Sequence, residues 1–180
     1  IEKISKVISL LKDNISISLS LQSSTPEVLE EIKRDNISQE GYMSISSDLK
    51  KDGKKSQAEL ICPLPRETFS SYKKGIEFLV NSKINRVSTH QLILSYGTDY
   101  DSQAYLDTYK YKAYYRPVAN CFGVYDGQFI IEPERIGVAT STFSEEDYLD
   151  SRLLCLWVEL VHNHDLFGMI SQYGLQLGLK

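Results

Sequence analysis

Three polar side chains in the first third of the chain have the chemistry needed to bind a nucleoside that carries an amino acid. Gln22 ends a run in which Ile and Leu alternate with Ser, Arg34 follows a helical pattern, and Glu59 stands in the next strand-like run. An amide can hydrogen-bond the two hydroxyls of a ribose, and a guanidinium offers a planar fork to a carboxylate. A second acid can orient the ribose or hold an ammonium group. The alternative is a surface strand followed by an amphipathic helix, with Glu59 paired to a lysine.

The elements that must position these residues alternate between strand and helix patterns. Residues 15–22 have the two-residue period of a strand. Pro26, preceded by Ser24 or Thr25 as the cap, predicts the first turn of a helix that ends at Asp35. By the same criteria, we expect helices over residues 4–11, 39–51 and 69–79, and strands over residues 57–62 and 86–94.

This alternation over the first hundred residues predicts a parallel sheet with crossover helices. In such folds ligands bind at the C-terminal ends of the strands. The predicted strand ends are Gln22, the turn at residues 62–65 and the turn at residues 94–97. We therefore expect the chemistry of the protein at these three positions.

The remainder of the chain changes character near Lys112, which divides it into a first part (1–112) and an extension (113–180). Two β-like runs flank Asp126-Gly127, a strong signal for a hairpin. Ser144 and Asp147 form a capping box that begins one long helix. We expect this helix to pack on the α/β part through its large apolar residues, Leu149, Leu153, Leu156, Trp157 and Leu160.

Composition narrows the class of protein. With 42% hydrophobic and 24% charged residues, the chain can bury a core, and its net charge of −4 argues against nucleic-acid binding. No apolar run is long enough to span a membrane. Cys62, Cys121 and Cys155 form no metal-binding spacing and suit a reducing, cytoplasmic location. The chain begins at Ile1 inside a helical pattern and ends without a helix stop signal, so we expect a longer protein.

Several ordered motifs together resemble the second half of a radical S-adenosylmethionine (SAM) barrel. The closest likeness is to cobalamin-type radical SAM proteins, some of which occur in polysaccharide gene clusters, and it covers about residues 4 to 163. The motifs that carry it are LSLQSSTPEVLEEIKRDN, AELICPLPRET, INRVSTHQLILSYGTD and the tail YYRPVANCFGVYDGQFIIEPERIGVATSTFSEEDYLDSRLL. The fold that this resemblance implies is α/β: the C-terminal half of a (βα)6-type partial TIM barrel with a C-terminal β-hairpin and helical extension.

The resemblance also implies a role for individual residues. Gln22 would bind the SAM ribose, Arg34 the methionyl carboxylate, and Glu59 the ribose or the pocket floor. The remaining residues implied at the pocket are Ile93 and Leu94 beside the adenine, Ile61 beneath it, and Ser20 and Ser23 as polar lining.

The implied activity belongs to a longer parent enzyme. Such an enzyme holds a 4Fe–4S cluster through a CxxxCxxC loop, which would lie upstream of Ile1, and it generates a 5′-deoxyadenosyl radical that abstracts a hydrogen from a substrate. A cobalamin domain would also lie upstream. The chain alone is therefore expected to be inactive, with the upstream half as its partner and a small molecule or a sugar-related compound as the substrate. Pro63 and Arg66 stand where the family has glycine, which puts close backbone contact at that turn in doubt.

Other residues have less specific interpretations. His90 either faces the substrate or is a core histidine, and we expect His162 to His164 to be a solvated helix end. We expect the tyrosines between residues 105 and 115 to serve core and interface packing, and Cys121 to be a buried thiol. The competing function is a non-catalytic binding or assembly module built on a half-barrel.

Overall fold

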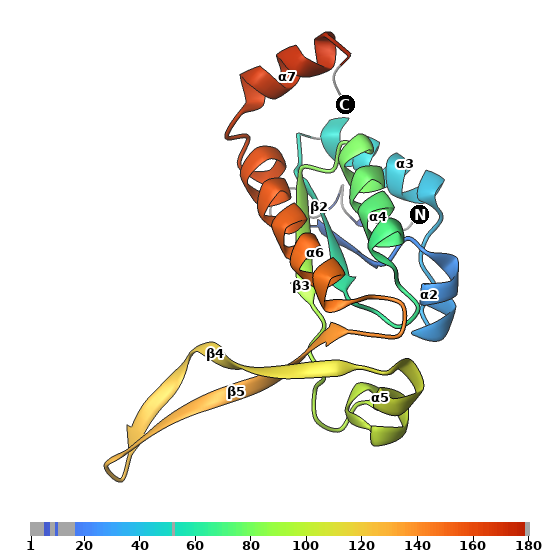
Figure 1. Cartoon of the computed structure of the whole chain (residues 1–180). Helices are drawn as coiled ribbons and strands as arrows, with labels where there is room; N and C mark the ends of the chain where they lie inside the picture. Colours follow the sequence, from blue (N-terminus) through green and yellow to red (C-terminus); the bar gives the residue numbers. More distant parts are fainter. Residues whose placement is uncertain (1–5, 8–9, 11–16, 52, 179–180) are drawn as a thin grey trace.

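The computed structural model describes residues 6–7, 10, 17–51 and 53–178. The helix expected over residues 4–11 lies largely outside the described residues, as does Ile15. The predicted α/β alternation is confirmed, because a parallel sheet in the order β1-β2-β3 forms the centre of the molecule (Figure 1). The strands are β1 (Ile17–Gln22), β2 (Ser56–Cys62) and β3 (Arg86–Gln91), and the helices between them are α2 (Pro26–Glu31), α3 (Gln39–Lys51) and α4 (Phe69–Asn81).

The main core lies between this sheet and the helices on one of its faces. Alternate strand residues, such as Leu19, Leu60 and Val87, point toward the helices and are buried. The helices contribute apolar stripes at helical spacing, represented by Ile45 of α3 and Leu79 of α4. Each fully buried aliphatic side chain of this kind stabilises the fold by about 1.5–3 kcal/mol.

A second apolar cluster lies at the C-terminal end of the sheet. Val28, Leu64, Leu92, Leu94 and Leu106 form its buried part. It joins α2 to the short helices that follow β3, which are η2 (Asp99–Asp101) and α5 (Gln103–Tyr109).

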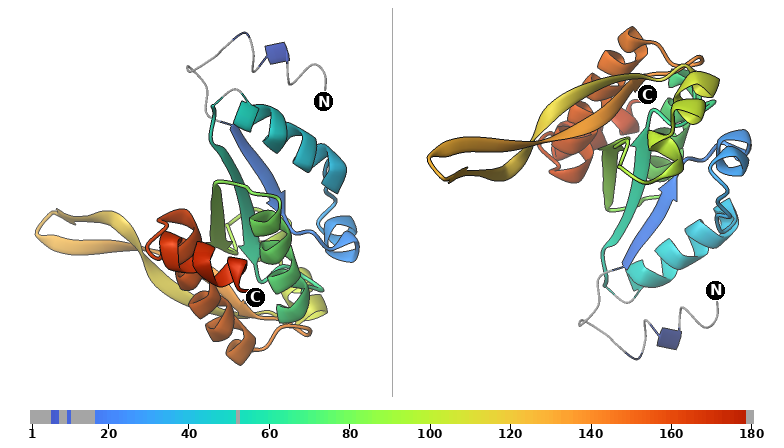
Figure 2. Two further views of the ribbon diagram at one scale, coloured as in Figure 1. Left: turned by 90° about the horizontal axis from the view of Figure 1, so that it is seen from above. Right: turned by 90° about the horizontal axis from the view of Figure 1, so that it is seen from below.

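The expected strand over residues 86–94 is divided in two. β3 ends at Gln91, and the next residues pair antiparallel with β5 through hydrogen bonds from Leu94 N to Arg135 O (2.8 Å) and from Gly137 N to Leu92 O (3.0 Å). The predicted hairpin is confirmed as β4 (Lys112–Tyr125) and β5 (Gln128–Ala139). Figures 1 and 2 show it as a long twisted arm that projects from the body.

Helix α2 is shorter than the sequence pattern predicts and ends at Glu31, before Arg34. Lys33 adopts φ +53°, and two hydrogen bonds close the helix, from Lys33 N to Glu30 O (3.1 Å) and from Arg34 N to Leu29 O (2.9 Å). This is a Schellman ending with lysine in the position that glycine usually takes. Arg34 therefore lies in the loop after the helix.

The long C-terminal helix begins with the predicted capping box at Ser144 and Asp147 and runs as α6 (Glu145–Trp157) into a π-helical segment, η3 (Val158–Asn163). The prediction of its packing face is wrong, because Leu149, Leu153, Leu156 and Trp157 are 51–66% exposed. The buried residues are the smaller Ser151, Cys155 and Val158.

Two contacts explain this choice of packing face. Ser151 Oγ lies 3.6 Å from Cys62 Sγ, and Cys155 Sγ lies 3.3 Å from the hydroxyl of Tyr72. The small side chains let α6 approach β2 and α4, whereas leucines would hold the helix away from them. A final helix, α7 (Gly168–Gln176), follows.

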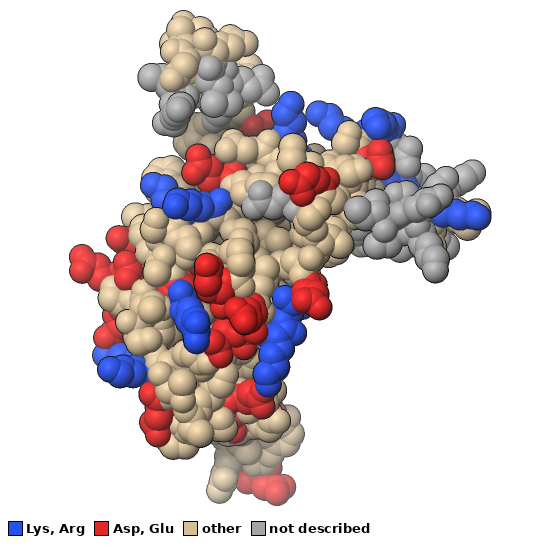
Figure 3. All heavy atoms as spheres, turned by 90° about the vertical axis from the view of Figure 1, so that its right-hand side faces the viewer, with Lys and Arg blue, Asp and Glu red and all other residues tan. Residues whose placement is uncertain are grey.

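The surface of the described part of the chain mixes the two charges on the face shown in Figure 3, where lysines and arginines alternate with acidic side chains instead of forming one basic stripe. Among the described residues, no helix has both the length and the apolar character needed to cross a membrane.

Candidate functional site

The face of the sheet opposite α3 and α4 carries polar side chains from all three strands. We call this set the polar face; its members are Ser18, Ser20, Gln57, Glu59, Ser88 and His90. They alternate along their strands with the buried core residues, so the two-residue period of the sequence gives one apolar and one polar surface. A parallel sheet is normally covered on both faces by apolar packing, which a surface of this composition does not suit.

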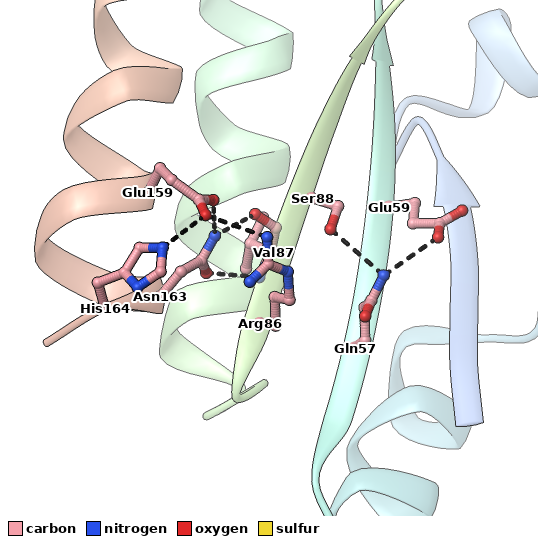
Figure 4. A network of polar contacts seen from close by, with 8 residues as sticks. All are labelled: Gln57, Glu59, Arg86, Val87, Ser88, Glu159, Asn163 and His164. Atoms are coloured by element: carbon pink, nitrogen blue, oxygen red, sulfur yellow. Dashed lines mark hydrogen bonds and ion pairs between the residues drawn. The ribbon is translucent and has the colours of Figure 1, made fainter. Parts of the chain in front are cut away.

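Glu59 lies at the centre of a hydrogen-bond network on the polar face. It accepts hydrogen bonds from Ser18 Oγ (3.1 Å), Ser20 Oγ (2.9 Å) and Gln57 Nε2 (3.3 Å). Gln57 Nε2 also donates to Ser88 Oγ (3.3 Å), so the network joins all three strands (Figure 4). Among the described residues no lysine pairs with Glu59, although the sequence allowed that alternative.

Glu59 is a carboxylate held in its charged form. Burial acts to raise its pKa, but the hydrogen bonds from Ser20 and Ser18 and the neighbouring His90 outweigh burial, so the pKa lies below its usual value. An ionised carboxylate is an acceptor only, and it can bind hydroxyl or ammonium groups of a ligand. His90 is exposed, which excludes the alternative of a core histidine.

Arg34 lies along the outer edge of β1. Its Nη2 donates to Ser20 O (2.9 Å) and its Nε to Asn36 Oδ1 (3.3 Å). Asn36 Nδ2 in turn donates to Leu21 O (2.8 Å) and Ser23 O (3.1 Å). Arg34 and Glu59 thus both contact Ser20, one at its backbone and one at its hydroxyl. Arg34 also lines a cavity of about 460 Å³ on the helix side of β1.

Gln22 occupies an unusual backbone position at the end of β1. Its φ is +60°, and the pairing with β2 shifts by one residue between Ser20 and Gln22. A left-handed residue other than glycine costs free energy and often marks a functional site. The side chain of Gln22 is half-buried and has no hydrogen bond within the described residues.

The apolar residues implied to surround the adenine are divided between surface and core. Ile61 is half-buried and contacts the second apolar cluster, and Ile93 is 40% exposed. Leu94 is only 1% exposed within that cluster, and its N–H is bound to Arg135 O. Ile61 and Ile93 therefore keep surface for a ligand, whereas Leu94 supports them from the core.

The sequence interpretation missed Glu67, a carboxylate that is only 1% exposed. It accepts hydrogen bonds from Ser23 Oγ (2.6 Å), Thr25 Oγ1 (3.1 Å) and Ser71 Oγ. It thereby ties the loop after β1 to the start of α4, and Ser23, at 2% exposure, serves this tie instead of lining a pocket. An acid two residues after a predicted turn carries no signal that separates it from a surface glutamate.

The turn after β2 combines rigid and glycine-like backbone. Pro63, Leu64 and Pro65 are buried, and Pro63 O accepts a hydrogen bond from Tyr111 (3.2 Å). Arg66 adopts φ +62°, the conformation that glycine favours, and its side chain pairs with Glu31 (2.8 Å).

The remaining thiols and histidines form no metal site: among the described residues, no three His, Cys, Asp or Glu side chains could hold a metal ion. The prediction that Cys121 is buried is wrong, because it lies in the projecting arm, where few contacts cover a side chain. His162 Nε2 lies 2.7 Å from Ile84 O, so His162 is not simply solvated.

No family model matches the chain, and no curated protein matches it.

Proposed function

We propose that the chain is the second half of a radical SAM barrel and that its polar face lines the cavity that holds SAM and the substrate. The observation that carries the proposal is the hydrogen-bond network around Glu59 on the open face of an all-parallel sheet. In a closed or partial barrel, this face turns toward the interior. There, a ring of serine, glutamine and carboxylate side chains lines a polar cavity instead of opposing an apolar core.

The positions of the implied SAM-binding residues support this proposal in part. Gln22 and Glu59 lie on the neighbouring strands β1 and β2. Ile61 is two residues after Glu59 on β2, so it lies on the same face of the sheet and nearer the C-terminal end of the strand. Arg34 supports it less, because it lies at the outer edge of β1 and lines the cavity on the helix side instead of the polar face. Its N–H donors that are not used on Ser20 and Asn36 remain for a carboxylate that reaches this edge. Arg66 retains the left-handed backbone expected where the family has glycine.

SAM bound at a reduced 4Fe–4S cluster would supply a 5′-deoxyadenosyl radical for hydrogen abstraction from the substrate. In the proposal, the cluster ligands and any cobalamin domain are upstream of Ile1. The residues of this chain bind and orient SAM and exclude water, while the cofactors provide the difficult chemistry.

The test is the affinity for SAM of a polypeptide that includes the coding sequence upstream of Ile1, measured by calorimetry. We expect Arg34→Ala to weaken binding by roughly 1.5–3 kcal/mol and Gln22→Ala by roughly 0.5–1.5 kcal/mol, because a charge-assisted hydrogen bond contributes more than a neutral one. Lys50→Ala, an exposed cation on α3, is the control and should leave the affinity unchanged. Unchanged affinity in both test variants would mean that these residues serve the fold only.

One observation favours a second candidate, a non-catalytic assembly module. The outward side chains of α6 and α7 include Leu153, Trp157, Met169 and Ile170, which are 51–89% exposed. Exposed apolar surface of this extent is typical of contact with another protein. The upstream coding sequence separates the two candidates, because an assembly module needs no CxxxCxxC loop.

A further inference from the structure

A trough of about 340 Å³ lies beside the polar face, between β3 and the α6–η3 helix. Its walls include Arg86, Ser88 and His90 from β3 and Arg152, Leu156 and Glu159 from the helix. Ser88 and His90 belong to both the trough and the polar face, so the two are continuous.

Among the described residues, the charged groups of the trough leave one arginine without a hydrogen-bond or ion-pair partner. Arg86 Nη2 binds Glu159 Oε1 (3.0 Å), and Glu159 also accepts from Asn163 Nδ2 (2.5 Å) (Figure 4). The carboxylate is therefore already neutralised by its neighbours. In the described part of the chain, no hydrogen bond or ion pair engages Arg152, which is exposed and lines the trough. The protein as a whole has a net charge of −4, so this local excess of positive charge stands out from its composition.

We propose that the trough binds the phosphate group of a phosphorylated small molecule, with Arg152 as its principal ligand. Guanidinium groups bind phosphate through two parallel hydrogen bonds. Ser88 Oγ accepts a hydrogen bond from Gln57, which leaves its own O–H to donate toward the trough. The His90 ring offers an N–H donor in either tautomer. The three donor groups are the guanidinium of Arg152 on α6 and the side chains of Ser88 and His90 on β3. Three groups match the three terminal oxygens of a phosphate monoester better than the two oxygens of a carboxylate.

Continuity with the polar face suggests how such a molecule would lie. Its phosphate would occupy the trough, and the rest of the molecule would extend over Ser88 and His90 toward Glu59. This orientation rests on the proposed function, in which the polar face lines the substrate cavity. The binding of phosphate itself does not require SAM, a cluster or an upstream segment.

The experiment measures the melting temperature of the 180-residue chain as phosphate replaces chloride at constant ionic strength and pH. Binding at one site stabilises the folded chain by RT ln(1 + [phosphate]/Kd), so the melting temperature rises with the logarithm of the phosphate concentration once this exceeds Kd. A general salt effect grows in proportion to concentration instead. We expect the logarithmic dependence for the unmodified chain. In Arg152→Ala, the Kd obtained from this dependence should rise about tenfold or more, because a charge-assisted pair of hydrogen bonds is lost.

Three further variants make the outcome decisive. Arg152→Lys keeps the charge without the fork and should give an intermediate value, and Lys50→Ala, an exposed cation on α3, should bind phosphate as the unmodified chain does. His90→Ala, on β3, should also weaken binding and decides the matter if Arg152→Ala does not melt cooperatively. A melting temperature of the unmodified chain that rises only in proportion to the phosphate concentration, or an unchanged Kd in Arg152→Ala, overturns the proposal. Since no SAM is present, neither result bears on the SAM-affinity test.

Discussion

At the scale of single residues, Arg34 serves the fold in a way that its sequence position does not indicate. An arginine after an amphipathic helix suggests a ligand, and the structure adds a structural task, because its guanidinium binds Ser20 O at the outer edge of β1. Glu59 was identifiable because an acid in a strand of alternating residues must point away from the core. Glu67 could not be identified from the sequence, because only the folded chain shows that three hydroxyl groups donate hydrogen bonds to it.

Arg34→Ala should reduce the free energy of unfolding of the chain by about 1–2 kcal/mol, because a charge-assisted hydrogen bond to the edge of β1 is lost. Urea unfolding measures this change. Arg66→Ala is the matched control: its ion pair with Glu31 lies at the surface, with 59% of the Arg66 side chain exposed, and should contribute less than about 1 kcal/mol. Equal losses in the two variants would show that Arg34 does not secure β1.

Stability should also decrease in alkaline solution. Burial raises the pKa of the Cys62 thiol and of the Tyr72 hydroxyl, so both groups stay neutral in the folded chain at a pH where they ionise in the unfolded chain. The stabilisation is complete below the unfolded pKa values, about 8.5 for the thiol and 10 for the tyrosine, and is lost as the pH rises above them. The urea concentration at the midpoint of unfolding should fall as the pH rises from 7 to 10.5. For Cys62→Ala, this midpoint should fall less between pH 8.5 and 10. A constant midpoint up to pH 10 would disprove a buried neutral thiol.

At the scale of elements, the helix α6–η3 shows what a sequence pattern predicts and what it leaves open. The capping box at Ser144 and the existence of the helix follow from local residue types. The packing face does not, because its buried members Ser151 and Cys155 are small and its leucines are exposed. The π-helical segment is equally invisible in the sequence, although it brings Asn163 against β3.

Asn163 acts as a side-chain extension of the sheet. Its Oδ1 accepts from Val87 N (2.9 Å) and its Nδ2 donates to Val87 O (2.9 Å), as a neighbouring strand would. Asn163→Ala should cost about 1–3 kcal/mol of unfolding free energy, because both backbone groups lose their partner. Hydrogen exchange should speed up at the Val87 amide. Asn81→Ala, an exposed asparagine at the end of α4, should change neither measurement, and protection at Val87 that survives Asn163→Ala would contradict this role.

At the scale of the whole molecule, the two edges of the parallel sheet differ. Among the described residues, η3 contacts β3 and β5 pairs with residues 92–94 just after it, whereas no hydrogen bond joins the extension to β1. In the same part of the chain, the hydrogen bonds that Arg34, Asn36 and Tyr42 donate to backbone carbonyls of β1 lie at its end, at Ser20 and Leu21. The arm adds uncovered apolar surface, with Phe122 and Phe129 each 62% exposed. Alternating patterns in the sequence predicted the sheet and the hairpin. Which edge of the sheet is covered could not be predicted, because this depends on contacts between distant segments that no local pattern encodes.

The chain should therefore self-associate at micromolar concentration through the edge of β1. A charged residue on an edge strand opposes such pairing, so Ser18→Lys should shift the sedimentation profile toward monomer. Ser47→Lys, which adds the same charge to an exposed position of α3, is the control and should leave association unchanged. A compact monomer of the unmodified chain at these concentrations would favour the binding module over half of a barrel.

The central proposal is that this chain completes a SAM-cleaving barrel, and the formation of 5′-deoxyadenosine tests it most directly. A polypeptide that includes the upstream coding sequence and the 180-residue chain are each reconstituted anaerobically with iron and sulfide, reduced and supplied with SAM. We expect 5′-deoxyadenosine from the longer polypeptide and none from the chain alone. Absence of the product from a longer polypeptide that holds a 4Fe–4S cluster, or its formation by the chain alone, would contradict the account.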